Sequence, residues 1–263
     1  MDNPLAQLHL VTIAERSSLQ NDMEELMDEN WPRYTFEANL PKAFQSPDLS
    51  WLSIYKFWPC YQFGLYNNAD DLVACGNSLP FALHGGMAGL SNQGWDWVIN
   101  QGISDYCMSA TTDTLTALAI TVSPNYRGKG YGCAAIMAMQ QIAAAQSLNH
   151  VVAPVRPSLK HLYPLITISE YLKWQNSCGK PFDPWLRTHI NIGGEVIRPC
   201  TESMTYTGKI AEWEEWLNMK FPVSATYVVP EMLSTLVVDR QFDRGTYVEP
   251  NVWVRHQVGA NGS

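Results

Sequence analysis

The sequence predicts an α+β or α/β fold, in which helices flank a central sheet, and three observations support this class. Segments with the pattern of strands alternate along the chain with segments of helical periodicity, and two of the strands form a hairpin. The chain has 263 residues, of which 46% are hydrophobic and 16% charged. A chain of this length can bury a large core without disulfides or a structural metal. No internal repeat or low-complexity linker interrupts the order of elements.

The first part of the sequence predicts a strand, two helical stretches and a hairpin. Glu15–Asn30 repeats apolar residues at helical spacing beneath an acidic outer face, so it predicts an amphipathic helix. Pro32, Pro41 and Pro47 bound a second, shorter helical stretch. The strand-like runs, the last two joined by a turn-forming sequence, are Leu8–Ile13, Tyr61–Tyr66 and Leu72–Asn77.

The rest of the sequence repeats this alternation after a glycine-rich stretch. Glycines cluster around Trp95 and Trp97 and predict an irregular segment there. Trp213, Trp216 and Leu217 fall on one face of a later helix, which indicates a core-facing side. The predicted strands are Thr112–Val122, Val151–Val155, Glu195–Arg198, Ser203–Thr207, Thr226–Val229 and Thr246–His256, and the helices are Tyr131–Ser147 and Lys209–Met219.

Composition excludes several classes of protein. The formal net charge of −8 repels polyphosphate and argues against a nucleic-acid partner. No signal peptide and no apolar stretch of membrane length is visible, so we expect a cytoplasmic protein with no membrane partner. The cysteines are scattered, without zinc-site spacing, and predict free thiols and no metal site: Cys60, Cys75, Cys107, Cys133, Cys178 and Cys200.

A glycine-rich turn at residues 123–132, Ser-Pro-Asn-Tyr-Arg-Gly-Lys-Gly-Tyr-Gly, joins the long strand to the long helix. Such a turn leaves several backbone N–H groups pointing the same way at the positive end of the helix dipole, which suits a phosphate. Its glycines let the backbone approach the anion closely, and its arginine and lysine add positive charge. No Lys-Ser/Thr pair follows, so it is not a Walker loop, and its glycine spacing does not fit a dinucleotide-binding fingerprint.

A strand, the pattern Val-x-Pro-x-x-Arg-Gly-x-Gly-x-Gly and an alanine-rich helix together resemble the acyl-CoA signature of the GNAT (GCN5-related N-acetyltransferase) superfamily. The resemblance implies a mixed, largely antiparallel sheet flanked by helices, a GNAT fold, and acetyl-CoA or another acyl-CoA as co-substrate. It implies that the turn holds the CoA pyrophosphate, while the preceding strand splays at a bulge and pairs with the pantetheine arm. The cofactor-binding residues so implied are Ile120, Thr121 and Val122 on the strand, and Arg127, Gly128, Lys129, Gly130, Tyr131, Gly132 and Cys133 in the turn.

The resemblance also implies one elaborated domain. Residues 1–258 are expected to form a single GNAT-like domain, with the family's elements in order over residues 8–198. An insertion at residues 156–182 and a C-terminal extension at residues 199–258 account for the extra length, and residues 259–263 are expected to be a flexible tail. The insertion is expected over the acceptor mouth, where it could form a lid or a homodimer contact.

A helix after the insertion carries the main catalytic candidate. Pro184–Gly194 fits the family helix that ends at a glycine, here Gly193, with Asp183 as a plausible N-cap. Four residues before that glycine, many family members have a tyrosine that protonates the departing thiolate, and this chain has His189. Imidazole titrates near neutrality, so it can serve as an acid or a base in this position.

The general base is less clearly indicated. The strand that leads into the turn lacks the glutamate that many family members use, and its only acid, Asp113, lies at its start. His84, at the end of the hairpin strand, is a second catalytic candidate. Glu170 and Glu202 are weaker candidates for the same proton transfer.

The expected activity is transfer of an acetyl group from acetyl-CoA to an amine of a small-molecule acceptor by direct attack. Trp95 and Trp97 lie where family members vary the loop that shapes the acceptor pocket, and indole rings can stack on an apolar or cationic acceptor. His189 also resembles the histidine that GNAT-like domains of polyketide loading modules place on this helix. One alternative is therefore a GNAT-like malonyl-CoA decarboxylase that loads a carrier protein, but Val155 occupies the position of the threonine that those domains use. Another is a non-catalytic acyl-CoA-binding protein.

Overall fold

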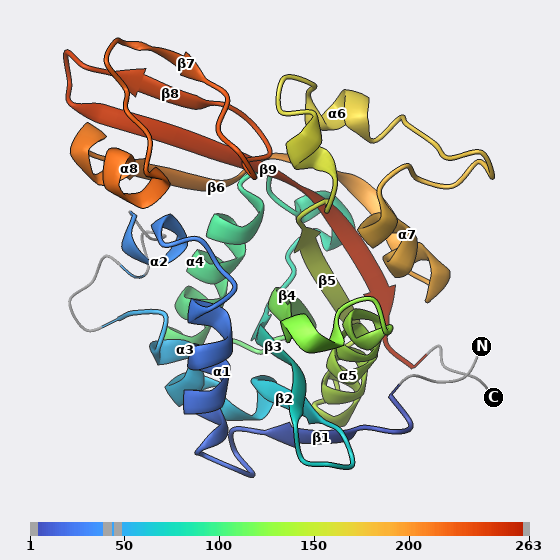
Figure 1. Ribbon diagram of the computed structural model, residues 1–263. Coiled ribbons are helices and arrows are strands. Elements are labelled where there is room, and N and C mark those ends of the chain that lie inside the picture. The colour runs from blue at the N-terminus through green and yellow to red at the C-terminus, as the bar shows by residue number, and fades with distance from the viewer. Residues whose placement is uncertain (1–4, 39–43, 45–48, 260–263) are drawn as a thin grey trace.

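A mixed sheet forms the centre of the protein in the computed structural model, which describes residues 5–38, 44 and 49–259 (Figure 1). Its strands lie in the order β1-β2-β3-β4-β5-β9-β8-β7, and β6 also pairs with β9. The strands are β1 (His9–Thr12), β2 (Phe63–Tyr66), β3 (Leu72–Phe81), β4 (Thr114–Val122), β5 (His150–Val155), β6 (Glu195–Gly208), β7 (Ala225–Tyr227), β8 (Leu236–Asp239) and β9 (Arg244–Gln257).

The two central strands, β4 and β5, are parallel, and the other neighbouring pairs of the described sheet are antiparallel. Pairing between β4 and β5 stops after Thr116 and Val152, although β4 continues to Val122 and β5 to Val155. β5 stays paired with β9 along its whole length. The two strands therefore diverge towards their C-terminal ends, and this divergence opens a gap in the middle of the sheet.

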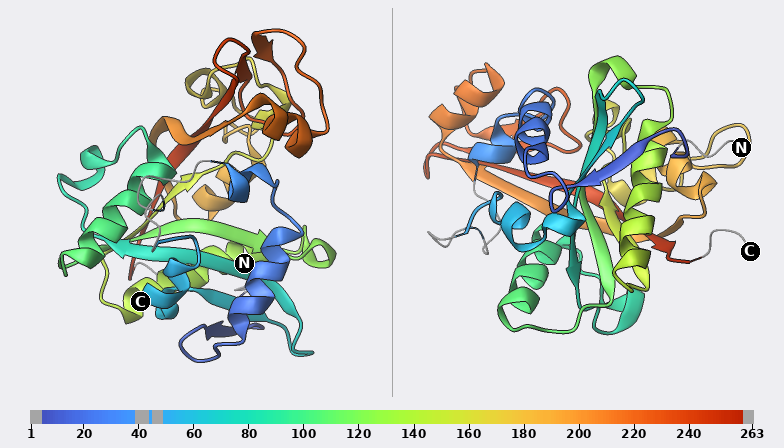
Figure 2. Two further views of the ribbon diagram at one scale, coloured as in Figure 1. Left: turned by 90° about the vertical axis from the view of Figure 1, so that its left-hand side faces the viewer. Right: turned by 90° about the horizontal axis from the view of Figure 1, so that it is seen from below.

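Helices cover both faces of the N-terminal part of the sheet, strands β1 to β4 (Figures 1 and 2). α1 (Leu19–Asp28), α3 (Ser53–Phe57) and α4 (Gly94–Cys107) pack their apolar sides on one face. The alanine-rich α5 (Tyr131–Ala145) packs on the opposite face against β2, β3 and β4. Because its core-facing residues are mainly alanine, α5 can lie close to the sheet and bring its N-terminus to the end of β4.

The C-terminal half extends the sheet and builds two further cores. The β7–β9 strands and β6 pack with α2 (Tyr34–Glu37) and α8 (Ile210–Leu217), and Trp213 lies buried at the centre of this core, as its position on the helix face predicts. α6 (Ile168–Tyr171) and α7 (Pro184–Asn191) pack against β5 and β9. Among the described helices, none is both long and apolar enough to cross a lipid bilayer.

The structure confirms most predicted elements and corrects several. The predicted irregular segment is confirmed before Gly94, where residues 86–89 form a short 3-10 turn, but Trp95 and Trp97 lie in the first turn of α4. Gly94 is required there for packing, because a Cβ at this position would clash with Ser203 of β6. The stretches 195–198 and 203–207 form one bulged strand, β6, and β8 was not predicted. Pro41, Pro47 and residues 260–263 lie outside the described residues.

Candidate functional site

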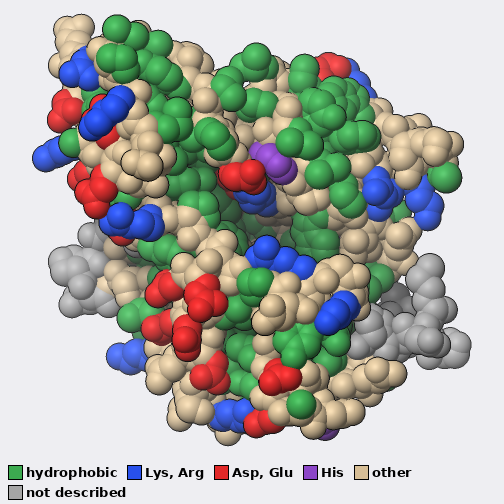
Figure 3. Space-filling model, in the orientation of Figure 1, with side chains coloured by type: hydrophobic (Ala, Val, Ile, Leu, Met, Phe, Trp, Pro, Cys, Tyr) green, Lys and Arg blue, Asp and Glu red, His purple; other side chains and the backbone are tan. Residues whose placement is uncertain are grey.

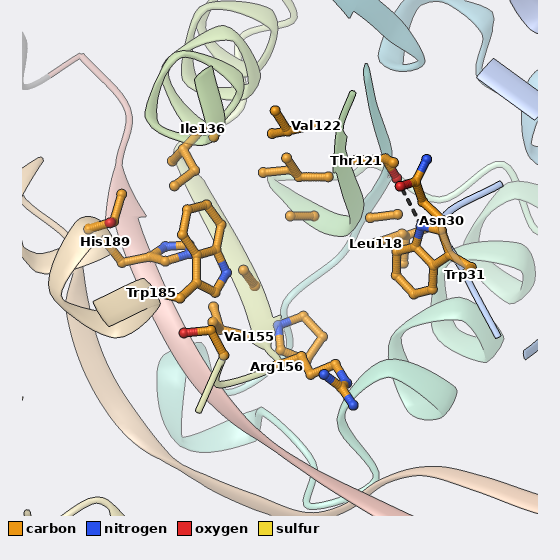
Figure 4. Close-up of a pocket in the computed structure, with 18 of the residues that line it drawn as sticks. Asn30, Trp31, Leu118, Thr121, Val122, Ile136, Val155, Arg156, Trp185 and His189 are labelled. Atoms are coloured by element: carbon orange, nitrogen blue, oxygen red, sulfur yellow. Dashed lines mark hydrogen bonds between the residues drawn. The ribbon is translucent and has the colours of Figure 1, made fainter. Parts of the chain in front are cut away.

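A cavity of about 830 Å³ occupies the gap between the diverging strands β4 and β5 (Figure 4). Its walls are residues 117–122 of β4, residues 153–155 of β5, the N-terminal end of α5 and one side of α7. The surface is hollowed at this place, with hydrophobic side chains along the walls and charged side chains at the mouth (Figure 3). The cavity is therefore a deep, mostly apolar cleft that reaches the edges of two strands.

The β4 edge of the cavity carries a bulge at Leu118. Ser78 of β3 pairs with Ala117 and Asn77 pairs with Ala119, so Leu118 is the extra residue. Its carbonyl oxygen accepts a hydrogen bond of 2.9 Å from the Trp95 indole. A strand edge without a neighbour presents free N–H and C=O groups, so residues 117–122 offer an extended ligand a line of backbone partners.

The glycine-rich turn lies at the end of this edge and needs glycine for its backbone. Gly128 has φ +76° and Gly130 has φ +86°, a region that other residues adopt only with strain. No neighbouring atom lies within 4 Å of a Cβ built at either residue, so the backbone conformation and not the space requires glycine. Gly130 caps α5, and the first turn of that helix has N–H groups without intrahelical acceptors. The turn thus has the geometry of an anion site.

Side chains fix the position of the turn. Arg127 donates a hydrogen bond of 2.6 Å to the Asn30 amide oxygen just after α1. Lys129 lies 5.0 Å from the centre of the Tyr126 ring, and the Tyr126 hydroxyl donates to Asp71 at 2.6 Å. Both cations are anchored at the turn, so they provide local positive charge in a protein whose formal charge is −8.

Two indole rings flank the cavity (Figure 4). Trp31 donates a hydrogen bond of 2.9 Å from Nε1 to the Thr121 hydroxyl and so covers the β4 side. Trp185 of α7 lies against Gly132, where an added Cβ would be 3.0 Å from the ring. Glycine is thus required at position 132 so that the Trp185 ring can pack closely. At Gly128 and Gly130, by contrast, the backbone conformation requires glycine.

α7 holds His189 at the cavity wall. Asp183 caps the helix by accepting hydrogen bonds from the backbone N–H groups of Trp185 and Leu186, as predicted. Gly193, at φ +87°, ends it. The same Asp183 carboxylate accepts from the Tyr171 hydroxyl at 2.9 Å, so the insertion and α7 are tied together.

His189 is paired with a second histidine, His256 of β9. The Nδ1 atom of His189 lies 2.9 Å from Nε2 of His256, and each side chain is almost fully buried. The other ring nitrogen of each histidine is buried and has no hydrogen-bond partner among the described residues. Burial and the neighbouring His256 lower the pKa of His189 to about 3, and burial lowers the pKa of His256 to about 4. Both rings are therefore neutral at physiological pH and share one proton between the facing nitrogens.

This pair predicts a pH-dependent loss of stability in acid. Below pH 6.5 the unfolded chain takes up protons that the folded pair refuses until about pH 3–4, so stability is lost as pH falls through this window. Burial raises the pKa of Asp96 to about 7, which has the opposite effect over pH 4–7, so the comparison must be between variants. We expect the Tm of His189→Gln/His256→Gln to fall less between pH 7 and 4.5 than that of the wild type. Parallel Tm curves would show that the pair is not buried as neutral imidazoles.

An ion pair forms the wall of the cavity beyond Val155. The Arg156 Nε atom lies 3.1 Å from both carboxylate oxygens of Glu249, whose side chain is buried. Glu249 also accepts from the Tyr247 hydroxyl at 2.8 Å, and Arg156 donates to the backbone oxygen of Glu231. Desolvation opposes the charge on Arg156, but the field of Glu249 more than offsets it and raises the pKa of the guanidinium. The buried Glu249 carboxylate thus fixes the orientation of the Arg156 guanidinium.

The structure brings most of the predicted cofactor residues together. Ile120, Thr121 and Val122 line the cavity, as do Arg127, Gly128 and Gly132. The remaining members of the turn, Lys129, Gly130, Tyr131 and Cys133, lie beside them without lining the cavity.

Several other predicted residues lie elsewhere. His84 is exposed after β3, whose end pairs with the start of β4, so it is at the opposite end of that strand from the turn and lines neither cavity. Asp113 accepts hydrogen bonds from the Leu83 N–H and the Thr114 hydroxyl at the same end. Glu170 and Glu202 are exposed and also lie outside the cavity. At these positions, none of the four candidate proton-transfer residues contacts the free edge of β4.

Sequence reasoning did not find Trp31, Arg156, Trp185, His256 or Glu249 as site residues. Trp31 follows α1 and Trp185 lies on α7, whereas Arg156 follows β5 and the other two residues lie on β9, so only the tertiary fold brings them together at the cavity. Among the described residues, no group of three or more histidine, cysteine, aspartate or glutamate side chains could hold a metal ion.

Comparison with known proteins agrees with this geometry. The Acetyltransferase (GNAT) family matches residues 20–165, which is more than half of the chain and includes the turn and both diverging strands. An arginine N-acetyltransferase of Aspergillus versicolor, avaD, is 27% identical over 259 residues, with 90% of this chain and 88% of that protein covered.

Two solved structures share the fold over nearly their whole length. The loading GNATL domain of CurA from Lyngbya majuscula is 18% identical, with a TM-score of 0.57, and 95% of this chain and 98% of that chain are covered. The GphF GNAT-like decarboxylase, solved in complex with isobutyryl-CoA, is 15% identical with a TM-score of 0.55 and the same coverage. At these identities the likeness concerns the fold, and it extends through the C-terminal strands.

Proposed function

The chain belongs to the acetyltransferase (GNAT) family, and on this premise we propose that it transfers the acetyl group of acetyl-CoA to an amine of a small-molecule acceptor. The observation that carries the proposal is the cavity between β4 and β5, which has an unpaired strand edge along one wall and the strained glycine turn at its end.

Acetyl-CoA would lie along the β4 edge. The N–H groups of the turn and the first turn of α5 would hold the pyrophosphate, with Arg127 and Lys129 adding charge. The pantetheine arm would pair with residues 119–122 as an added strand does, between Trp31 and Trp185. The thioester would then reach the bulge at Leu118, where backbone N–H groups can polarise its carbonyl.

The reaction would be a direct attack. The neutral amine nitrogen forms a bond to the thioester carbonyl carbon, the carbon–sulfur bond breaks, the amine loses a proton and the sulfur gains one. His189 lies at this wall beside the Trp185 ring, and its buried Nε2 would contact the sulfur once that ring moves aside. Because its ring is neutral, it would act as a hydrogen-bond donor through Nε2 when His256 donates to its Nδ1. Positioning of the two reactants would supply much of the rate.

The acceptor is proposed from the relative and from the cavity together. The relative avaD is an arginine N-acetyltransferase, and arginine or a similar amine is the first acceptor to test. The alternative of malonyl-CoA decarboxylation lacks support at Val155, which lines the cavity at the end of β5 without a hydroxyl group.

The test is to follow free CoA thiol and carbon dioxide with separate substrates. We expect thiol release from acetyl-CoA that depends on an added amine, and none without it. We expect no carbon dioxide from malonyl-CoA above the rate with heat-denatured protein. Binding of acetyl-CoA without amine-dependent thiol release would support a non-catalytic role, and carbon dioxide release would support the decarboxylase instead.

A further inference from the structure

A second cavity, of about 290 Å³, adjoins the first on the other side of the β4 bulge. The two share six lining residues, so they meet at the place where the thioester would be attacked: Trp31, Thr35, Leu118, Ala119, Met204 and Tyr206. From there the second cavity runs between α1, α3 and α4. A molecule that presents its nucleophile at Leu118 would therefore have its other end in this second cavity.

Aromatic rings and sulfur atoms form most of its walls. Trp51 and Trp95 stack with ring centres 5.8 Å apart and planes 16° from parallel. Trp31, Tyr55 and Phe36 line the cavity as well, and Met27 and Met204 add thioether sulfurs. Faces of indole and phenol rings carry negative electrostatic potential and attract cations, while their hydrocarbon surface also accepts an aliphatic stem.

The only charged side chains that line this cavity, among the described residues, are acidic. Glu24 and Asp28 lie one turn apart on α1, and no lysine or arginine lines the cavity. Figure 3 shows acidic side chains gathered over α1, beside the hollow. Glu24 accepts one hydrogen bond, from Gln20 at 2.7 Å, and has no basic partner in the described part of the chain. An aromatic cavity with unneutralised carboxylates favours a cation over a neutral group.

We propose that the second cavity binds the far end of the acceptor, and that this end is a guanidinium or another cation on an aliphatic stem. The inference rests on the proposed function, because the far end of the acceptor is defined as the end away from the amine that is acetylated at Leu118. Trp51 and Trp95 would contact the stem and the face of the cation, and Glu24 and Asp28 would meet its charge. The acceptor would thus be an amine with a second positive group, and not a simple alkylamine.

The experiment uses two acceptors that differ only at that end. Agmatine and N-carbamoylputrescine have the same primary amine and stem, but one ends in a guanidinium and the other in a neutral urea. Their binding to the protein with CoA is followed by tryptophan fluorescence, since Trp31, Trp51 and Trp95 line the cavity. Acetyl transfer to each is measured separately as thiol release from acetyl-CoA.

We expect agmatine to bind about tenfold more tightly than the urea, and Glu24→Gln/Asp28→Asn to remove most of that preference. Glu25→Gln is the matched control, because it removes an exposed charge from the same helix outside the cavity, and it should leave the preference unchanged. Equal binding of the two amines, or a preference that the double variant keeps, would overturn the cation site. Absence of acetyl transfer to either amine would instead count against the proposed function, whatever the binding result.

Discussion

Replacing Gly130 with valine is expected to weaken acetyl-CoA binding by about 30-fold or more. At φ +86° a β-branched residue costs roughly 2 kcal/mol or more, and the turn can relieve that strain only by moving the N–H groups at the start of α5. No neighbouring atom lies within 4 Å of a Cβ built at Gly130, so the expected effect comes from the backbone conformation. The measurement is the Kd for acetyl-CoA by calorimetric titration.

Gly179→Val is the matched control for this variant. Gly179 has φ +71° and equally open surroundings, but it lies in the insertion, away from the cavity. It should lose a similar amount of folding stability and keep its Kd for acetyl-CoA. If Gly130→Val binds as tightly as Gly179→Val, the turn does not hold the cofactor.

Replacing His189 with alanine is expected to lower kcat about a hundredfold, while the Kd for CoA changes little. A positioned proton donor or acceptor contributes about 10²–10⁴ to a rate, and a neutral imidazole that donates a hydrogen bond belongs at the low end. The split between kcat and Kd separates this role from a purely structural one, since unfolding would lower kcat and also raise the apparent Kd for CoA. His189→Asn, which keeps a hydrogen-bonding side chain beside His256, should recover part of kcat.

His256→Gln is the companion variant. A glutamine amide can still donate to Nδ1 of His189, so this variant should keep more activity than His189→Ala. Unchanged kcat in His189→Ala would remove the residue from the mechanism and leave the pair as a packing feature of α7 and β9.

The formal charge of −8 and the anionic cofactor are compatible because the relevant charges are local. Arg127 is held at the turn by Asn30, and Lys129 by the Asn125 backbone oxygen at 3.1 Å. Glu24 and Asp28 of α1 line the second cavity, where they would favour a cationic acceptor. The same overall charge that opposes the cofactor would thus assist the acceptor.

The sequence was sufficient for the features that depend on neighbours in the chain. The strand, the glycine turn and the alanine-rich helix lie within residues 114–145, and their local pattern predicted their structure, which is confirmed. Their role as an anion site stays a prediction. The cap at Asp183 and the helix end at Gly193 were also local and are confirmed.

Features made by contacts between distant segments could not be predicted in this way. His256 meets His189 across 67 positions of sequence, and Glu249 meets Arg156 across 93. The start of α4 was predicted as irregular because Gly94, needed for close packing against Ser203 of β6, looks like a turn former when the packing is unknown. The bulges of β6 likewise could not be predicted from the local sequence, so this single strand was expected as two strands.

The most direct test of the central proposal follows the acetyl group itself. The protein is incubated with acetyl-CoA labelled in its acetyl carbons and with agmatine, and the label is located by mass spectrometry. The account predicts that label appears in an amide of agmatine in equal amount to the CoA thiol released. Label that remains on CoA, or that is released only as acetate, would contradict it.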